Sequence, residues 1–281
     1  MNYRFSLIGY PINHSLSPWI HEQFLMKADL QGNYTINEIE PSKYVENKIK
    51  TVMESGIHGF NVTVPYKQKI IPFLDEVDPL ADKMGAVNTV ANKNGTWIGY
   101  NTDGIGYVRS LESKYPELLL DKSQHVLLIG AGGAARGIYS ALDHTGFTRI
   151  DITNRTKESA NEIARLGSPQ TTTKTLSLQE AENKLGDYGV IIQTTSVGMK
   201  PGVGQSIIKM DNLKSTSIVS DIIYQPLKTK FLMDAKASGA SIHLGHTMLL
   251  YQAQYAFEIW TGKQVPIDNM DNELQLILEG R

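Results

Sequence analysis

The strongest constraint on the fold is an apolar segment that runs directly into a glycine-rich turn and then into a helical pattern. Residues 125–129 predict a buried strand, and residues 130–137 have the sequence GAGGAARG. This turn matches the spacing G-x-G-x-x-[GA] with Gly130, Gly132 and Ala135. Gly130 permits a tight turn, Gly132 lets the backbone approach a pyrophosphate, and Ala135 allows close packing of helix on strand. The pattern favours a dinucleotide-binding βαβ unit over a turn that serves packing alone.

The end of the next predicted strand indicates which dinucleotide binds. Sites for NAD usually carry an acidic residue about 20 residues after the glycines, where it binds the ribose 2′-hydroxyl. Residues 153–157 have the sequence TNRTK instead. Arg155 can meet a 2′-phosphate with paired donors, and Lys157 adds charge nearby. Asp151 is the rival ribose ligand, and a solvated basic turn is the plain alternative; the sequence favours NADP.

Apolar strand-like segments alternate with amphipathic helical ones almost throughout the 281 residues, which is typical of α/β architecture. The expected strands are 3–9, 33–40, 59–64, 86–92, 96–100, 125–129, 149–153, 190–194 and 218–222. The main expected helices are 18–28, 43–54 and 248–260. Asn94 and Gly95 form a favourable hairpin turn between two of the strands, so the first sheet is expected to be mixed.

The chain is long enough for two domains, each with its own core. A polar stretch at 114–123 places the boundary between residues 103 and 124. We expect residues 1–103, completed by the C-terminal segment 241–281, to form one domain, and residues 104–240 to form the nucleotide domain. The tail from 268 to 281 is expected to be a short helix.

Composition excludes several classes of protein. The formal net charge of −2 disfavours a nucleic-acid binder, and the absence of cysteine excludes disulfides and cysteine-based metal sites. The seven histidines show no His-Glu-x-x-His spacing, so no catalytic metal is expected. No signal peptide and no apolar run of about 18 residues is present, so we expect a cytoplasmic protein without a membrane partner.

Two polar stretches follow apolar runs in the first half of the chain. Residues 61–67 have the sequence NVTVPYK, and residues 101–104 have the sequence NTDG. Asn61 and Thr63 share one face of a strand, and Lys67 follows in the next turn. A lysine and an aspartate beside amides and hydroxyls suit a site that holds a polyhydroxylated molecule and moves a proton. The plain alternatives are a solvated Lys67 and an Asp103 that caps a helix.

Two serines near a predicted helix start add to these stretches. Residues 15–18 have the sequence SLSP, and Ser17 before Pro18 is a good helix N-cap. Ser15 has no such structural reason. Paired hydroxyls at this position could bind a carboxylate without a second charge.

Eight segments, in this order, resemble the shikimate dehydrogenase family over nearly the whole chain. They are residues 15–18, 61–67, 85–89, 101–104, 130–136, 154–156, 195–199 and 245–252. The resemblance implies an α/β protein of two domains, an N-terminal mixed-sheet substrate domain and a Rossmann-type NADP-binding domain. It also implies reversible, NADPH-dependent reduction of 3-dehydroshikimate to shikimate, a step toward aromatic amino acids.

The resemblance assigns roles to single residues. Lys67 and Asp103 would be the catalytic pair. The substrate carboxylate would lie near Ser15, Ser17 and Tyr224, and the ring hydroxyls near Asn61, Thr63, Lys67, Asn88, Asp103 and Gln252. The cofactor residues would be Gly130, Ala131, Gly132, Gly133, Ala134, Asn154, Arg155, Thr156, Lys157, Thr195, Met199, Ile223, Gly245 and Met248.

Two positions depart from the pattern of many relatives. Residues 193–196 have the sequence QTTS where many relatives have NATS, and Ser159 stands where a second arginine often follows. One alternative is a quinate or dual quinate/shikimate dehydrogenase with relaxed cofactor choice. Another is a non-catalytic homologue that senses NADP. The oligomeric state is expected to be a monomer or a homodimer.

Overall fold

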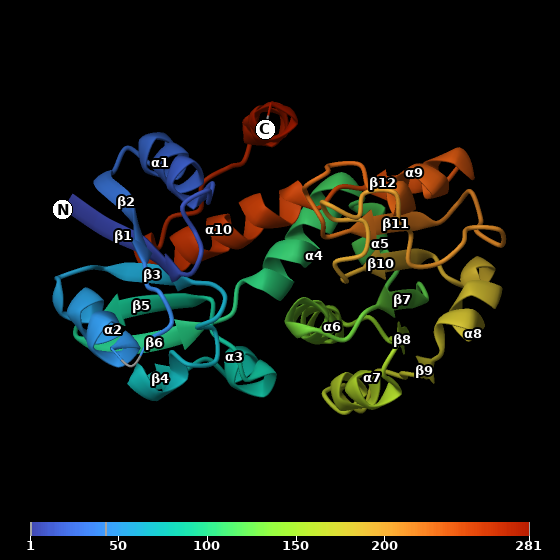
Figure 1. Cartoon of the computed structure of the whole chain (residues 1–281), viewed down its shortest axis with the longest axis horizontal. Coiled ribbons are helices and arrows are strands. Elements are labelled where there is room, and N and C mark those ends of the chain that lie inside the picture. Colours follow the sequence, from blue (N-terminus) through green and yellow to red (C-terminus); the bar gives the residue numbers. More distant parts are fainter. Residues whose placement is uncertain (1, 43, 281) are drawn as a thin grey trace. The chain divides into compact units, whose positions relative to one another are not determined.

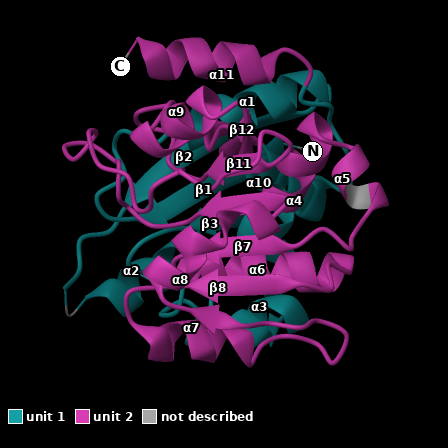
Figure 2. Cartoon of the chain, turned by 90° about the vertical axis from the view of Figure 1, so that its right-hand side faces the viewer, with its two compact units in different colours: residues 1–106, 251–267 teal, residues 107–250, 268–281 magenta. Residues whose placement is uncertain are grey.

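The computed structural model describes residues 2–42 and 44–280, apart from the side chain of residue 119. The chain divides into two compact units, which Figure 2 shows in different colours. Unit 1 comprises Met1–Gly106 and Tyr251–Ile267, and unit 2 comprises Tyr107–Leu250 and Asp268–Arg281. The expected division assigned the whole segment 241–281 to the first domain. In the structure only its middle part, 251–267, belongs to unit 1.

Unit 1 is built on a six-stranded mixed sheet with the strand order β2-β1-β3-β5-β6-β4. The strands are β1 (Asn2–Gly9), β2 (Gln31–Glu38), β3 (Gly59–Val62), β4 (Glu76–Val77), β5 (Thr89–Lys93) and β6 (Thr96–Tyr100). β1 pairs in parallel with β2 and β3, whereas β3, β5 and β6 pair antiparallel. The β5–β6 hairpin turns at Asn94 and Gly95, both with positive φ, which confirms the expected mixed sheet.

Helices cover both faces of this sheet (Figure 1). They are α1 (Ser17–Lys27), α2 (Val45–Glu54), α3 (Pro79–Met84), the short 3₁₀ helix η1 (Ile71–Phe73) and the later part of α10 (His246–Thr261). On one face Phe5 stacks on Trp260 of α10 at 4.5 Å between ring centroids. On the other face Ile8 and Phe60 are fully buried with Ile49 of α2. Successive residues of a strand point to opposite faces, so each strand contributes to both layers.

Unit 2 is built on a six-stranded, wholly parallel sheet with the order β12-β11-β10-β7-β8-β9. Its strands are β7 (Val126–Ile129), β8 (Ile150–Thr153), β9 (Thr175–Leu176), β10 (Val190–Gln193), β11 (Ile218–Asp221) and β12 (Ser241–His243). This is the doubly wound order of a Rossmann-type fold, in which the strand order reverses between the first and fourth strands. Here those two strands are β7 and β10, so ligands are expected at their carboxyl ends.

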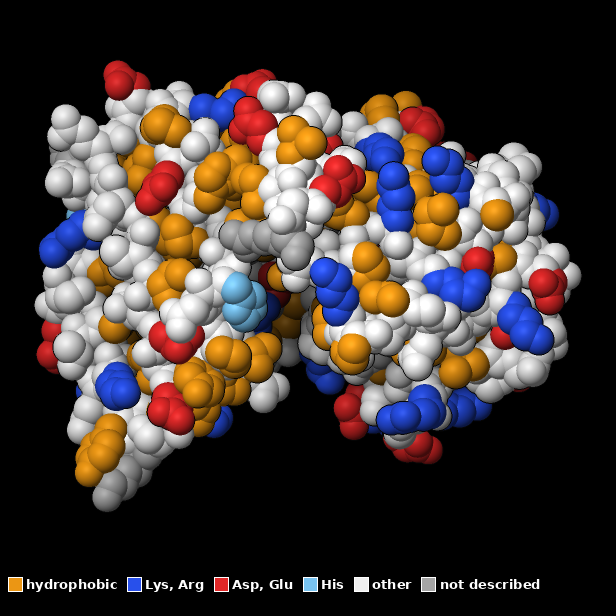
Figure 3. Space-filling model, turned by 45° about the horizontal axis from the view of Figure 1, so that its top comes forward, with side chains coloured by type: hydrophobic (Ala, Val, Ile, Leu, Met, Phe, Trp, Pro, Cys, Tyr) orange, Lys and Arg blue, Asp and Glu red, His pale blue; other side chains and the backbone are white. Residues whose placement is uncertain are grey.

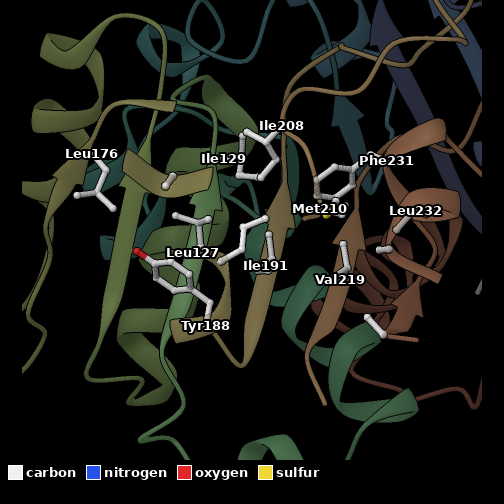
Figure 4. Close-up of a cluster of buried hydrophobic side chains, with 14 residues drawn as sticks. Leu127, Ile129, Leu176, Tyr188, Ile191, Ile208, Met210, Val219, Phe231 and Leu232 are labelled. Carbon is white, nitrogen blue, oxygen red and sulfur yellow. The ribbon is translucent and has the colours of Figure 1, made fainter. Parts of the chain in front are cut away.

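The helices of unit 2 include α6, which follows the glycine turn, and several short connections. Their bounds are α5 (Glu117–Leu120), α6 (Gly133–Thr145), α7 (Lys157–Ala164), α8 (Leu178–Asn183), the 3₁₀ helix η2 (Leu185–Asp187), α9 (Lys230–Ala237) and α11 (Met270–Glu279). Figure 4 shows Leu127, Ile191 and Val219 from three neighbouring strands beside Phe231 of α9. All four side chains are fully buried. This apolar layer fixes the strands that carry the glycine turn.

The C-terminal tail is helical, as expected, and α11 packs within unit 2. Met270, Leu274 and Leu278 are buried, and Asp271 accepts a hydrogen bond from Nε2 of His246 at 2.6 Å. These contacts explain why residues 268–281 group with unit 2. The helices α4 (Asp103–Lys114) and α10 each contribute residues to both units.

None of the helices within residues 2–42 and 44–280 is long and apolar enough to cross a membrane. Figure 3 shows acidic and basic side chains interspersed on one face of the molecule. No group of three or more potential metal ligands occurs in the described part of the chain.

Candidate functional site

The centre of the candidate site in unit 1 is an ion pair between Lys67 and Asp103. Lys67 Nζ lies 2.5 Å from Asp103 Oδ2, and the two side chains keep 31% and 20% of their exposure. Val87 N donates to the backbone oxygen of Lys67 at 2.8 Å, so the chain at Lys67 is fixed to the segment before β5. The pair is therefore held in place while remaining accessible. Lys67 is thus paired with a carboxylate and not surrounded by solvent alone, and the Asp103 carboxylate binds a lysine.

Asn88 orients the second oxygen of the aspartate. Its Nδ2 donates to Asp103 Oδ1 at 2.8 Å and to Thr102 Oγ1 at 3.0 Å. Its Oδ1 accepts from Thr102 N at 2.8 Å. Because a backbone N–H can only donate, this last bond fixes which way the amide points. Both oxygens of Asp103 are thus engaged by side chains of unit 1.

Asn61 and Thr63 lie at the carboxyl end of β3. β3 ends at Val62, earlier than expected, but Thr63 N still donates to Ile8 O at 2.9 Å, so the strand conformation extends to Thr63. Asn61 is buried, whereas Thr63 is half-buried. Val62 packs into the apolar cluster on the opposite face of the sheet. The alternation therefore places Asn61 on the face predicted from the sequence.

The two serines differ from the expected capping arrangement. α1 begins at Ser17 itself, and its N-cap residue is Leu16, which makes no side-chain cap bond. Ser15 Oγ instead accepts from Ser17 N at 3.2 Å and lies 3.1 Å from Ser17 Oγ. Ser17 is therefore the first residue of the helix and not its N-cap, and its backbone N–H is bound by Ser15. The two hydroxyls are nevertheless adjacent, as a carboxylate site requires.

The remaining predicted substrate residues lie in different units. Gln252 is on α10 in unit 1, where its Oε1 lies 3.5 Å from Thr102 Oγ1. It therefore joins the same group of side chains as Asn88 and Asp103. Tyr224 follows β11 in unit 2 and is exposed.

In unit 2 the glycine turn leaves open space at the start of α6. A Cβ at Gly132 or Gly133 would meet no atom within 4 Å. Gly132 is the N-cap residue and supplies no side-chain cap bond, so the first N–H groups of α6 remain available for an anion. Ala131 and Ala134 flank the turn as half-buried residues, and Ala135 is fully buried. The residues fit a pyrophosphate.

The first glycine of the turn is required by its neighbours. Gly130 has a φ of +115°, and a Cβ there would lie 2.5 Å from Thr194 Oγ1. Thr194 N and Oγ1 both donate to Ile129 O at 2.8 Å. The end of β10 is thus bonded to the end of β7. Thr195 lies beside the turn at the point where the strand order reverses, which is where the fold places its ligand.

The predicted 2′-phosphate residues follow β8. Asn154 Nδ2 donates to Thr156 O at 2.9 Å, which shapes the turn. Arg155, Thr156 and Lys157 are exposed. Within the part of the chain that the structure describes, Arg155 makes no ion pair. Its guanidinium is therefore available to a ligand.

Asp151, the rival ribose ligand, is committed elsewhere. It is buried in β8, and its Oδ2 lies 3.0 Å from both His125 Nε2 and the Tyr188 hydroxyl. Its Oδ1 accepts from Lys174 N at 3.0 Å. A carboxylate with these partners stabilises the sheet. This geometry favours the choice of NADP that Arg155 suggested.

Four further predicted cofactor residues lie in unit 2, and two of them, Ile223 and Gly245, lie at the end of β11. Ile223 is buried and Met199 is exposed, while Met248 is half-buried on α10. A Cβ at Gly245 would lie 2.5 Å from the backbone of Ile222. Gly245 thus lets the chain before α10 pass directly against the end of β11.

Comparisons with known proteins agree with this geometry. Residues 7–90 match the family model of the shikimate dehydrogenase substrate binding domain, residues 115–222 that of shikimate/quinate 5-dehydrogenase, and residues 245–275 that of the shikimate 5′-dehydrogenase C-terminal domain. The NADP⁺ shikimate dehydrogenase of Oceanobacillus iheyensis is 52% identical over 281 residues, which cover 100% of both chains. The protein of the same name from Geobacillus kaustophilus is 46% identical over 275 residues, covering 98% of this chain and 97% of that one.

The chain belongs to the shikimate dehydrogenase family. Its fold is also similar to a crystal structure of shikimate 5-dehydrogenase from Listeria monocytogenes in complex with shikimate and NAD. That similarity has a TM-score of 0.90 at 32% identity and covers 97% of this chain and 96% of the other.

Gln193, which departs from the sequence of many family members, has a defined role here. It is fully buried, its Nε2 donates to Val197 O at 3.1 Å, and its Oε1 accepts from Thr195 N. Nε2 also lies 3.3 Å from both oxygens of the buried Asp221. The glutamine therefore folds the loop that carries Thr195 back on β10 and β11.

The sequence analysis did not identify the buried polar residues that bind Asn88 and Asn61. Thr102 and Thr89 are fully buried and contact Asn88 on two sides, and Tyr34 contacts Asn61. Thr102 lies inside the motif at 101–104 and Thr89 ends the one at 85–89, so the motifs themselves were the available signal. Tyr34 lies in no motif, and only its strand register brings it to the site.

Proposed function

We propose that this chain is an NADP-dependent shikimate dehydrogenase that reversibly reduces 3-dehydroshikimate to shikimate. The observation that carries the proposal is the Lys67–Asp103 pair, held by Asn88 at the end of β3 and the start of α4. An ammonium group at this position can stabilise an alkoxide and exchange a proton with it. Full-length similarity to NADP⁺ shikimate dehydrogenases supports the same reaction.

The substrate would bind to the polar side chains of unit 1. Ser15 and Ser17 offer adjacent hydroxyls to the carboxylate, which avoids placing a third charge beside Lys67 and Asp103. Asn61 and Thr63 at the end of β3 and Gln252 on α10 would hold ring hydroxyls. Asn88, whose amide is used within the protein, would act by orienting Asp103. Tyr224, which the family resemblance also assigns to the carboxylate, is exposed in unit 2.

Proton transfer would fall to Lys67. When the substrate hydroxyl is oxidised, its proton would pass to the neutral amine of Lys67, and in the reverse direction the resulting ammonium group would return the proton. Asp103 holds the ammonium group in place through the 2.5 Å contact and would accept a hydrogen bond from a neighbouring hydroxyl. The bound nicotinamide supplies the hydride chemistry.

The nucleotide would bind to unit 2. The glycine turn, residues 130–134, would hold the pyrophosphate at the start of α6, and Asn154, Arg155, Thr156 and Lys157 would hold the 2′-phosphate. Thr195, Met199, Ile223, Gly245 and Met248 would line the nicotinamide end. The open space at Gly132 and the available guanidinium of Arg155 support this orientation.

Four progress curves test the proposal. Purified protein is mixed with shikimate or quinate, each with NADP⁺ or NAD⁺, and the absorbance of reduced nicotinamide is followed. We expect the highest kcat/KM for shikimate with NADP⁺. A higher value for quinate with NAD⁺ would instead identify a quinate dehydrogenase, and NADP⁺ binding without any turnover would identify a sensor.

We further propose that the protein works in the cytoplasm as a monomer or homodimer, on small molecules and not on nucleic acid. The net charge of −2 and the mixed charges in Figure 3 support the last part. Size-exclusion chromatography with light scattering distinguishes the two oligomeric states.

A further inference from the structure

A chain of buried hydrogen bonds runs from β2 across the sheet of unit 1 to the Lys67–Asp103 pair. We propose that Tyr34, at the far end of this chain, and Thr89, in its middle, are positioning residues for the site. The inference rests on the proposed function of the pair. Neither residue belongs to the predicted substrate-binding or catalytic set.

Tyr34 forms the first link. Its hydroxyl donates to Asn61 Oδ1 at 2.8 Å, although β1 lies between their two strands. The ring stacks on the imidazole of His21, with centroids 4.4 Å apart and planes inclined by 4°. Burial raises the pKa of Tyr34, and a hydrogen bond with Ser17 opposes that shift only in part. The hydroxyl therefore keeps its proton and remains a donor at every working pH.

The bond to Asn61 connects Tyr34 to the site, because Asn61 is proposed to hold a ring hydroxyl of the substrate. The stacking partner of Tyr34, His21, stays neutral, because burial lowers the pKa of that histidine to about 3.

Thr89 forms the middle link. It lies directly opposite Asn61 in the antiparallel ladder of β3 and β5. Asn61 Nδ2 donates to Thr89 Oγ1 at 3.0 Å and to Asn88 O at 3.3 Å. The carbonyl can only accept, so the amide of Asn61 has one allowed orientation, with its oxygen toward Tyr34.

The chain continues to the charged pair. Thr89 Oγ1 lies 3.1 Å from Asn88 Oδ1, and Asn88 Nδ2 donates to Asp103 Oδ1. Tyr34, Asn61, Asn88 and Thr89 are all at most 6% exposed, so water does not substitute for these bonds. A buried network in which every member is satisfied holds its members in one arrangement. The network ends at the Asp103 carboxylate, which holds Lys67.

The network determines how Asn61 can bind a substrate hydroxyl. Both of its N–H groups and one lone pair of Oδ1 are used within the protein. A substrate hydroxyl at Asn61 must therefore donate to the remaining lone pair of Oδ1. Loss of the Tyr34 hydroxyl would leave this oxygen without its buried donor.

The test compares Tyr34→Phe, which keeps the ring on His21 and removes only the hydroxyl, with Thr89→Val and Thr89→Ser. We expect Tyr34→Phe and Thr89→Val each to lower kcat/KM for shikimate by about 10-fold, the effect of one lost buried hydrogen bond partner. Thr89→Ser, which retains a hydroxyl, should stay within about 2-fold of the parent protein. KM for NADP⁺ should be unchanged in all three, since the network lies wholly in unit 1.

The double variant Tyr34→Phe/Thr89→Val distinguishes loss of the network from general destabilisation. Tyr34 and Thr89 share Asn61 as a partner, so their effects should combine to clearly less than the product of the single effects. Tyr66→Phe is the matched control: its buried hydroxyl donates to Ile39 O at 2.6 Å in the same unit, outside the network. It should lose stability but keep both kinetic constants.

Each outcome decides the question. Parent-like kcat/KM in folded Tyr34→Phe, an equal loss in Tyr66→Phe, or a multiplicative double variant would overturn the inference while the proposed function stands. Absence of shikimate turnover by the parent protein would overturn the proposed function itself. If Tyr34→Phe does not fold, the Thr89→Val and Thr89→Ser pair carries the same test.

Discussion

The candidate sites of the two units are organised in opposite ways. In unit 1 the polar side chains bind one another, so the Lys67–Asp103 pair is oriented by the protein itself. In unit 2 the candidate site offers open space at Gly132, available N–H groups at the start of α6 and an exposed Arg155. The first arrangement suits chemistry that needs fixed geometry, and the second suits an anionic ligand that supplies the missing partners.

Removal of the charged group in unit 1 should have the largest effect. We expect Lys67→Ala to lower kcat by about 10²–10⁴-fold with little change in KM for shikimate, because the amine acts mainly on the developing charge. Steady-state kinetics measure both constants. Lys69→Ala, which removes a nearby exposed lysine, is the control and should match the parent protein. An unchanged kcat in folded Lys67→Ala would remove the lysine from the mechanism.

Removal of the charged group in unit 2 should act on the cofactor alone. We expect Arg155→Ala to lower kcat/KM for NADP⁺ by about 10–100-fold, the loss of charge-assisted hydrogen bonds to a phosphate, and to leave the value for NAD⁺ unchanged. The ratio of the two values is the measurement. Arg165→Ala, an exposed arginine at the end of α7, is the control. Equal losses with both cofactors would show that Arg155 does not contact the 2′-phosphate.

Two glycines of the turn, Gly130 and Gly132, allow ligand binding to be separated from folding. Gly132→Ala should leave the free energy of unfolding almost unchanged, because its Cβ meets nothing, yet lower kcat/KM for NADP⁺ by about 10-fold. Gly130→Ala should instead lower the free energy of unfolding by about 1–3 kcal/mol, because a φ of +115° and the contact with Thr194 exclude a side chain. Urea unfolding and initial rates measure the two effects. Full cofactor affinity in Gly132→Ala would contradict the pyrophosphate site.

Each unit also contains a buried histidine that should make the protein sensitive to acid. Burial lowers the pKa of His21 in unit 1 and of His243 in unit 2 to about 3. The unfolded chain takes up these protons near pH 6.5 and the folded chain does not, so the free energy of unfolding falls as the pH drops from 6.5 to about 3.

The variant His243→Asn separates the contribution of His243 to this pH dependence from the contributions of other titrating groups. Asp221 has the opposite effect on the pH dependence of stability, since burial raises the pKa of that carboxyl to about 6. Relative to the parent protein, His243→Asn should lose up to about 1.4 kcal/mol per pH unit of the pH dependence between 6.5 and 3. Urea titrations at several pH values test this. Identical pH dependence in variant and parent would show that His243 titrates normally in the folded protein.

The sequence predicted the parts of the fold that repeat locally. The glycine turn, the Asn94–Gly95 hairpin and the long helix over 248–260 all follow from patterns within a few residues. The short strands β4, β9 and β12 were missed, because two or three residues carry no periodicity. The tail at 268–281 groups with unit 2 through contacts such as His246–Asp271, which the sequence does not reveal.

For the candidate site, the sequence indicated candidate residues but not their hydrogen-bond partners. Ser15, Lys67 and Asp103 stood out by residue type and position. Tyr34 did not, because its contact with Asn61 depends on the register of two strands that are not adjacent. A residue that acts through another leaves little local signal, so only coordinates show it.

The most direct test of the account is a crystal structure of the protein with shikimate and NADP⁺ bound. We expect Lys67 Nζ to lie within hydrogen-bond distance, about 3 Å, of the hydroxyl on the carbon that loses the hydride. We also expect the 2′-phosphate on Arg155. A structure in which Lys67 Nζ is still paired with Asp103 but lies far from that hydroxyl would contradict the proposed role of Lys67.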